Sequence, residues 1–204
     1  EAVTKVAHDY DHEAKVVLQN DQLGTGHAVL QAADALVGFE GKVIVLYGDT
    51  PFVKPETLQA MLDAKADVVV LGFEPEDAGR YGRLVTDGAS LERIVEFKDA
   101  SPEERAITLC NSGVICCFAP LLFELLNKVS NDNATGEYYL TDVIGLARTA
   151  GHTATVVTCL EAETLGINSR AELAAADALF QAASRLSLLE DGVTLVAPET
   201  VYLS

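Results

Sequence analysis

The distribution of apolar residues along the chain constrains its fold more than any other feature. Two short runs, Lys42–Tyr47 and Asp67–Phe73, are almost continuously apolar and are followed by glycine or acidic residues. Such runs are typical of strands that are covered on both faces, as in a parallel sheet. A segment with apolar residues at helical spacing, Gly26–Val37, precedes the first run. This alternation predicts an α/β domain.

Local signals predict the remaining elements. Asp87-Gly88 separates the short apolar stretches Tyr81–Thr86 and Leu91–Phe97, which is typical of a β-hairpin. Three further strands are expected at Ala14–Leu18, Ile107–Phe118 and Thr153–Thr158, and four further helices at Pro55–Ala66, Pro120–Val129, Glu137–Gly151 and Ser169–Leu186. The chain has no repeat, so we expect one α/β domain with an inserted hairpin region.

The charge of the chain limits its partners. The net charge is −17, from 31 acidic and 14 basic side chains. This argues strongly against a nucleic-acid partner, which requires a basic face. The same charge repels anionic substrates, so a site for them needs local cations or a metal ion.

Apolar runs and cysteines suggest where the protein is found. No run of about 18 apolar residues occurs, and the acidic start lacks the basic head of a signal peptide, so we expect no membrane partner. None of the four cysteines forms a C-x-x-C pair, and Cys116 and Cys117 are adjacent in an apolar run. We interpret them as reduced core residues, which suggests a cytoplasmic protein.

The first candidate site is Tyr47-Gly48-Asp49, at the end of an apolar strand. Ligands of open α/β sheets bind at the carboxyl ends of strands, and Gly48 would let the backbone approach one closely. An aspartate there can hold Mg²⁺, with substrate phosphates as further ligands. Alternatively, Asp49 only caps a turn before Pro51.

The second candidate is the polar segment 19–27, between a predicted strand and a predicted helix. Backbone N–H groups at a helix N-terminus suit anions and other acceptors, and the Gln19 amide suits the edge of a nucleobase. The alternative is a glycine turn in which Thr25 is the N-cap.

Further candidates follow along the chain. Glu96, with a glycine opposite, could receive sugar hydroxyls, or it could belong to a charged edge that protects a strand. Asn111 and Ser112 form a polar pair inside an apolar strand, which is costly unless the pair bonds to something. Residues 136–142 and 166–169 each lie at a helix start, where simple capping is the alternative.

The order of these segments is more specific than any one of them. The chain reads Leu23-Gly24-Thr25-Gly26-His27-Ala28, Tyr47-Gly48-Asp49-x-Pro51, Tyr81-Gly82-Arg83, Ile94-Val95-Glu96-x-Lys98-Asp99, Asn111-x-Gly113, Gly136-Glu137-Tyr138-Tyr139-x-Thr141-Asp142 and Ile167-Asn168. From about Gln19 to Val196, this set resembles the uridylyltransferase domain of the bifunctional GlmU family. The resemblance implies a mixed, mostly parallel open sheet of the nucleotide-diphospho-sugar transferase type.

The resemblance also implies a reaction and a site. The family transfers UMP from UTP to N-acetylglucosamine 1-phosphate with Mg²⁺, for the synthesis of cell-envelope precursors. By resemblance, the nucleotide would be bound by Gln19, Gln22, Gly24, Thr25, Tyr47 and Gly48. The sugar would be bound by Gly82, Glu96, Asn111, Tyr139, Thr141 and Asn168. Asp49 would be catalytic and would hold Mg²⁺ together with Asn168.

The chain departs from the family pattern at both ends. The glycine-rich loop L-x-x-G-x-G-T-R-M and the lysine that follows it are absent. We therefore expect residues 1–192 to be an incomplete nucleotidyltransferase domain that lacks its own cationic groups and is inactive alone. Residues 193–204 would begin a linker or the first coil of a β-helix, through which the full-length protein would form a homotrimer. Two alternatives remain, which are another nucleotide or sugar specificity and a non-catalytic binding relic.

Overall fold

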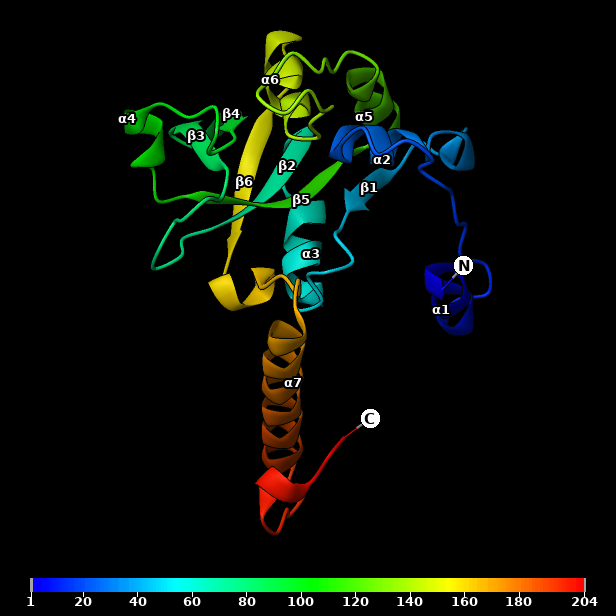
Figure 1. The fold of residues 1–204 in the computed structure, drawn as a ribbon, viewed down its shortest axis with the longest axis vertical. Helices are drawn as coiled ribbons and strands as arrows, with labels where there is room; N and C mark the ends of the chain where they lie inside the picture. Colours follow the sequence, from blue (N-terminus) through cyan, green and yellow to red (C-terminus); the bar gives the residue numbers. More distant parts are fainter. Residues whose placement is uncertain (1, 204) are drawn as a thin grey trace.

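A computed structural model describes residues 2–203 and shows one mixed sheet with helices on both faces (Figure 1). The strands are β1 (Lys42–Val45), β2 (Val68–Phe73), β3 (Arg83–Asp87), β4 (Ser90–Val95), β5 (Cys110–Phe118) and β6 (Ala154–Cys159). The α-helices are α1 (Ala2–Tyr10), α2 (Thr25–Leu30), α3 (Pro55–Asp63), α4 (Pro102–Arg105), α5 (Ala119–Leu126), α6 (Asp142–Thr149) and α7 (Arg170–Glu190). Short 3₁₀ helices occur at η1 (Asp34–Leu36), η2 (Glu161–Thr164) and η3 (Pro198–Thr200).

The central strand β5 runs against its neighbours. It pairs antiparallel with β1, β2 and β3, while β2 and β6 pair in parallel and β3 and β4 form an antiparallel hairpin. The mixed α/β architecture and the hairpin are therefore confirmed. The described sheet has fewer parallel pairings than expected, because an apolar run reports the burial of a strand and not the direction of its neighbour.

Successive residues of β2 face two separate parts of the core. Val68 and Val70 pack with the apolar faces of α2, α5 and α6, whereas Val69 and Leu71 pack on the opposite side with Met61 of α3. All of β2 is buried, so the prediction of a doubly covered strand is confirmed there. The same prediction is wrong for β1, which is half-buried and pairs only with the antiparallel β5 within residues 2–203.

Two other predicted elements differ from the structure. Residues 14–18 form no strand, since no strand of the described chain lies beside them. The helix predicted over Gly26–Val37 ends at Leu30, and the chain continues as tighter turns with i→i+3 bonds, such as Ala33 N to Leu30 O. The helical spacing was thus correct, but it did not distinguish an α-helix from 3₁₀ turns.

The helix predicted from Glu137 begins only at Asp142. Backbone bonds hold Tyr138 in an extended segment, because its N–H donates to Leu23 O and its carbonyl accepts from Gly26 N, each over 2.8 Å. These contacts with the start of α2 replace the first helical turn. They keep the residues before α6 extended, beside the glycine turn.

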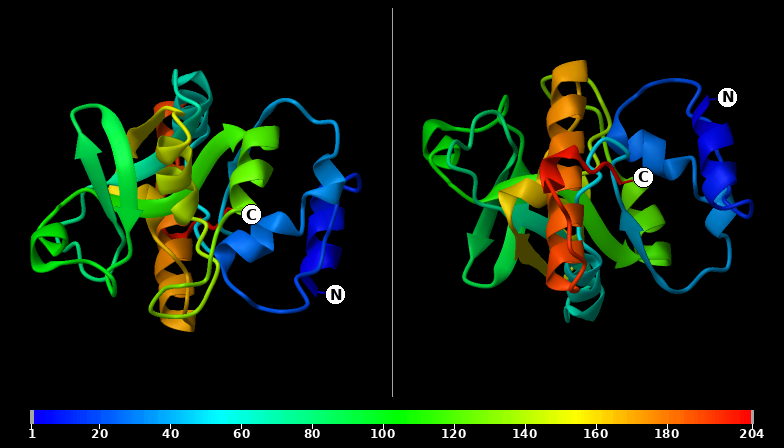
Figure 2. Two further views of the ribbon diagram at one scale, coloured as in Figure 1. Left: turned by 90° about the horizontal axis from the view of Figure 1, so that it is seen from above. Right: turned by 90° about the horizontal axis from the view of Figure 1, so that it is seen from below.

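The β3–β4 hairpin and α1 lie at opposite sides of the molecule (Figure 2). The sequence did not indicate α1, which has no buried residue. The long helix α7 projects from the domain, and only Ala176 and Gln181 of it are buried (Figure 1). Among residues 2–203, no helix has both the length and the apolar composition that crossing a membrane requires.

The four cysteines are free thiols, as predicted, and three of them are in β5. Cys110, Cys116 and Cys117 are buried, whereas Cys159 of β6 is partly exposed. Burial raises the pKa of all four thiols, that of Cys117 to about 12 and that of Cys159 to about 11. They therefore remain protonated near neutral pH.

Candidate active site

One edge of β5 is divided between two strands. β1 pairs with the C-terminal part of β5, from Ile115 to Phe118, and β3 pairs with its start at Cys110. The first cavity, of about 770 Å³, is lined by the β5 residues between these pairings, Asn111, Ser112 and Gly113. Its volume lies in the range of small-molecule sites.

A bulge in β5 explains the polar pair inside this strand. The register against β2 shifts between Val70 and Gly72, so β5 carries extra residues there. The Ser112 hydroxyl donates to the Leu71 carbonyl over 2.7 Å, and Asn111 Oδ1 accepts from Gly113 N over 3.0 Å. Both side chains thus compensate for irregular backbone pairing, which satisfies the condition that burial imposes on them.

Gly113 is required for the position of Tyr47. Its φ is +90°, and a Cβ atom there would lie 1.9 Å from Cε2 of the Tyr47 ring. Any side chain at this position would therefore displace the ring. Burial raises the pKa of the Tyr47 phenol, and the charge of Glu96 raises it further, while the Thr25 side chain acts in the opposite direction.

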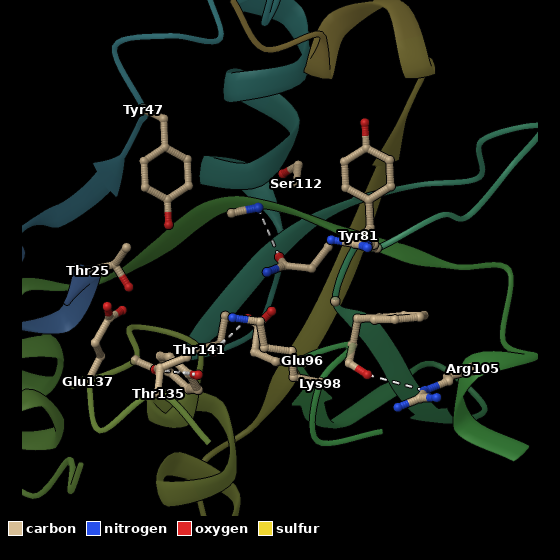
Figure 3. A pocket seen from close by; sticks show the side chains of 16 residues that line it. Thr25, Tyr47, Tyr81, Glu96, Lys98, Arg105, Ser112, Thr135, Glu137 and Thr141 are labelled. Atoms are coloured by element: carbon tan, nitrogen blue, oxygen red, sulfur yellow. Dashed lines mark hydrogen bonds between the residues drawn. The ribbon is translucent and has the colours of Figure 1, made fainter. Parts of the chain in front are cut away.

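Five of the six residues proposed for the sugar come together at the first cavity, whereas the sixth, Asn168, does not line it. Figure 3 shows Glu96 and Thr141 near its middle, and Gly82, Asn111 and Tyr139 also line it. The Thr141 hydroxyl donates to Glu96 Oε1 over 3.3 Å. A Cβ on Gly82 would lie 3.4 Å from Glu96 Oε2, so the glycine leaves room for the carboxylate. These observations give the residues a common location, and their roles stay predictions.

Glu96 lies in an unfavourable environment for a negative charge. Burial raises the pKa of its carboxyl, the hydrogen bond from Thr141 lowers it, and the charges of Asp99 and Asp142 raise it further. Asp142 itself has a raised pKa, because of burial and the charge of Asp99. A ligand that donates hydroxyl hydrogen bonds to Glu96 would relieve this desolvation.

A second cavity, of about 510 Å³, contains Asp49 and Asn168. It shares Tyr47, Tyr81 and Asn111 with the first. Ile167 N donates to the Asp49 carbonyl over 2.8 Å, which brings the two predicted metal ligands to one site. The second cavity therefore adjoins the first, through side chains that line both.

The oxygen donors of the second cavity fit a hard cation. Glu172, which the sequence analysis missed, also lines it and accepts from Asn168 N over 2.6 Å. The sequence Ser169-x-x-Glu172 was a capping signal, and Ser169 indeed accepts from Glu172 N. Within residues 2–203, no group of three His, Cys, Asp or Glu side chains is placed to hold a metal alone. Mg²⁺ would need ligands from a substrate, as is usual for this ion.

A buried glutamate fixes the segment that carries Asn168. Glu163 is 5% exposed, and its Oε2 accepts from Lys54 N over 3.2 Å and from the Thr57 hydroxyl over 2.6 Å. It thus ties η2 to the start of α3. Sequence reasoning also missed this residue, because nothing in the local pattern distinguishes it from the neighbouring Glu161.

Three of the residues predicted to bind the nucleotide, Gln19, Gln22 and Gly24, lie outside the two cavities. The Gln19 amide donates to the Gly24 carbonyl over 3.1 Å and contacts His27 Nδ1 over 3.0 Å, so it stabilises the glycine turn. Gln22 is exposed. Gln19, Gln22 and Gly24 line neither cavity, so their assignment to the nucleotide stays a prediction.

Thr25 and Gly48 were also predicted to bind the nucleotide, and the structure places them differently. Thr25 lines the first cavity, and its hydroxyl accepts from Leu140 N over 3.0 Å. It is the first residue of α2 and not the N-cap, which is Gly24, so the capping alternative is wrong. Gly48 is exposed between Tyr47 and Asp49, and a Cβ there would have open space around it.

The expectation that the chain lacks its own cationic groups is wrong for the first cavity. Arg80, Lys98 and Arg105 line it, although they are far apart in the sequence. Tertiary folding brings them together, through the loop before β3, the loop after β4 and α4.

Comparisons with curated proteins show similarity to bifunctional GlmU proteins. The chain is 66% identical over 194 residues to the "Bifunctional protein GlmU" of Ruegeria sp. (strain TM1040), and 62% identical over 206 residues to that of Roseobacter denitrificans. These alignments cover 94% and 100% of this chain, and 43% and 46% of the relatives. The chain thus spans less than half the length of these curated relatives. No protein-family model matches it.

Solved structures share the fold. An inositol-1-phosphate CTP transferase from T. maritima superposes with a TM-score of 0.63 at 16% identity, over 84% of this chain and 67% of that one. A putative glucose-1-phosphate thymidylyltransferase from Bacillus anthracis gives 0.62 at 18% identity, over 87% and 70%. At these identities the similarity establishes the architecture alone.

Proposed function

Because this chain resembles, over nearly its whole length, a part of the bifunctional GlmU proteins, we propose that it forms most of a uridylyltransferase site. The reaction would join UMP from UTP to N-acetylglucosamine 1-phosphate and release pyrophosphate. The single observation that supports this best is the pair of adjoining cavities. One holds the oxygen donors Asp49 and Asn168, and the other holds Glu96 and Thr141.

The two cavities suggest which residues would bind the sugar and which would bind the metal ion. In the first, Glu96, Thr141 and Asn111 would orient the sugar hydroxyls and the acetamido group. In the second, Asp49 and Asn168 would hold Mg²⁺, which supplies charge neutralisation to the phosphates when it is bound. Tyr47 lines both cavities and would fix the sugar phosphate between them.

No proton needs to be removed from the nucleophile. The phosphate of the sugar is already anionic, so it can attack the α-phosphate of UTP in line while pyrophosphate leaves. The residues of the chain would act by positioning the two reactants, which can lower the barrier by several kcal/mol. This fits a site without a nucleophile–base pair.

Specificity and context are further parts of the proposal. We infer UTP and N-acetylglucosamine 1-phosphate as substrates from the relatives' names and from the location of Asn111, Tyr139 and Thr141. Another nucleotide or sugar specificity is the alternative, and a non-catalytic binding protein is a second. The domain boundary at residue 192, a cytoplasmic location and a homotrimer of the whole protein stay predictions.

The test is pyrophosphate release by the whole protein that contains this chain, with Mg²⁺. Turnover is expected with UTP and N-acetylglucosamine 1-phosphate, and much less with CTP, dTTP or glucose 1-phosphate. Asp49→Asn should reduce kcat by about 10²–10³, as the loss of one electrostatic contact to a transition state commonly does. Asp177→Asn, an exposed position on α7, is the matched control. Ligand binding without turnover would favour the non-catalytic alternative.

A further inference from the structure

Four of the 14 basic side chains lie in or beside the first cavity. Arg80, Lys98 and Arg105 line it, and Arg83 lies buried against residues that line it. Within residues 2–203, none of the four has a carboxylate oxygen within 4.0 Å, and every ion pair there involves other cations. In a chain with 31 acidic side chains, four unpaired cations in one place require an explanation.

Arg83 carries a buried charge without a counter-ion. It is 2% exposed, and its guanidinium donates to three carbonyls, those of Arg105 over 3.4 Å, Gly79 over 3.2 Å and Tyr81. Carbonyl dipoles replace water in part but leave the net charge in place. Because the surroundings have a low dielectric constant, its field extends into the adjacent cavity.

Arg105 extends the same positive region to the cavity surface. Its guanidinium lies 4.6 Å from the centroid of the Phe97 ring, and that of Arg83 lies 5.9 Å from it. Two like charges are thus held near one aromatic ring. Cation–π contacts stabilise each of them but do not neutralise either. An anion in the cavity would reduce their mutual repulsion.

None of the four cations forms an ion pair with Glu96 within residues 2–203. The charges that act on the Glu96 carboxyl are those of Asp99 and Asp142. Figure 3 shows Thr25 and Glu137 at one end of the cavity, Glu96 and Thr141 in the middle, and Arg105 at the other end. Lys98 and Arg105 line only the first cavity, whereas Asp49 and Asn168 line only the second. The cation group is therefore separate from the proposed metal site.

We propose that Arg80, Lys98 and Arg105 form a subsite for a second phosphate, carried on the side of a sugar away from its anomeric carbon, as in a hexose 6-phosphate. Glu96 and Thr141 would bind hydroxyls of the same ring. Arginine suits this ligand, because its planar donors bind phosphate oxygens in pairs. The proposal goes beyond the uridylyltransferase reaction, whose sugar substrate carries one phosphate.

Calorimetric titration of the whole protein tests this subsite without turnover. The probes are N-acetylglucosamine 6-phosphate, neutral N-acetylglucosamine and inorganic phosphate. The 6-phosphate is expected to bind about tenfold or more tightly than the neutral sugar, as charge-assisted hydrogen bonds allow, and less tightly as salt increases. Inorganic phosphate should bind more weakly than the 6-phosphate. Equal affinities for the 6-phosphate and the neutral sugar would overturn the proposal, whether or not the protein is a uridylyltransferase.

Variants of the cationic side chains test where the 6-phosphate binds. The double variant Arg80→Gln, Lys98→Gln removes two side chains that make no hydrogen bond within residues 2–203, so the fold should be unaffected. It should lose about tenfold in affinity for the 6-phosphate and less than about twofold for the neutral sugar. Lys65→Gln, at an exposed lysine outside the cavities, is the control and should change neither. A double variant that is folded by circular dichroism and binds the 6-phosphate like the parent would overturn the assignment.

Discussion

Asn111 serves both the fold and the site through different ends of one amide. Its carbonyl oxygen accepts from Gly113 N and stabilises the bulge of β5, while its residue lines both cavities. Since the amide nitrogen has no partner within residues 2–203, it can donate to a ligand. The structural and functional interpretations of this residue are therefore compatible, and the same holds for Tyr47.

Glu96→Gln is expected to weaken sugar-phosphate binding and to stabilise the fold. A glutamine still accepts from Thr141, but it lacks the charge that strengthens bonds to sugar hydroxyls, so KM for the sugar phosphate should rise about tenfold with little change for UTP. Initial-rate kinetics with each substrate varied in turn measures the difference. An unchanged KM for the sugar phosphate would show that Glu96 does not contact the sugar.

The same variant has a pH-dependent effect on stability. Because the pKa of Glu96 is raised in the folded chain, its stabilising contribution is present at low pH and is lost as the pH rises through the raised pKa. Glutamine avoids that loss. Thermal unfolding should therefore occur at a higher temperature in the variant than in the parent at pH 7, and at nearly the same temperature at about pH 4.

Gly113→Ala is expected to destabilise the chain by about 2 kcal/mol or more, because it combines a positive φ with a clash against Tyr47. The matched control is Gly145→Ala in α6, where a Cβ would have open space. That change should stabilise by about 0.5–1 kcal/mol, since alanine is the better helix former. Urea unfolding of both variants measures the contrast, and equal effects would contradict this account of Gly113.

At the scale of elements, η2 connects the start of α3 to the segment that carries Asn168, through the hydrogen bonds of Glu163. Glu163→Ala would leave Lys54 N and the Thr57 hydroxyl without their acceptor and should cost about 1–3 kcal/mol. Glu161→Ala, two residues away and free of side-chain hydrogen bonds within residues 2–203, should change stability by less than about 0.5 kcal/mol. Urea unfolding distinguishes them. Mg²⁺ affinity should also fall in the Glu163 variant, because the Asn168 segment would no longer be fixed.

Elements whose signal is local were predicted well from the sequence. The buried run of β2, the hairpin at Asp87-Gly88 and the start of α7 follow from periodicity, turn residues and capping, although α7 ends at Glu190 and not at the predicted Leu186. Elements that depend on partners distant in the sequence were not predicted well. The direction of β5 and the extended start before α6 arise from strand pairing and from bonds of Tyr138 to Leu23 and Gly26, which local patterns do not encode.

The candidate site shows the same division. The prediction that Glu96, Asn111, Tyr139 and Thr141 line one cavity is confirmed, because these residues lie at or near the ends of β4, β5 and α6. The motifs did not indicate Glu163 or Glu172, and they did not show that Lys98 lies at one cavity with Arg80 and Arg105. Their significance depends on burial, on backbone contacts and on charges that meet only after folding.

For the whole molecule, the unequal distribution of charge is the main electrostatic feature. The net charge is −17, whereas four cations without an ion pair within residues 2–203, Arg80, Arg83, Lys98 and Arg105, lie in or beside one cavity. A focused positive region in a negative molecule attracts anions locally and repels them elsewhere. Ligand selection by this chain is therefore expected to depend strongly on where a phosphate is attached to the sugar.

The rate at which the cysteine thiols react with an alkylating reagent can report how often the sheet opens. Only a thiolate reacts with an alkylating reagent, so the raised pKa of all four thiols and the burial of Cys110, Cys116 and Cys117 should slow their labelling in the folded chain. Labelling of Cys116 and Cys117 would thus record how often the centre of the sheet opens, while Cys159, on the edge strand β6, would record shorter-range opening. Mass spectrometry over time should find Cys159 modified first and the β5 pair together, at one rate.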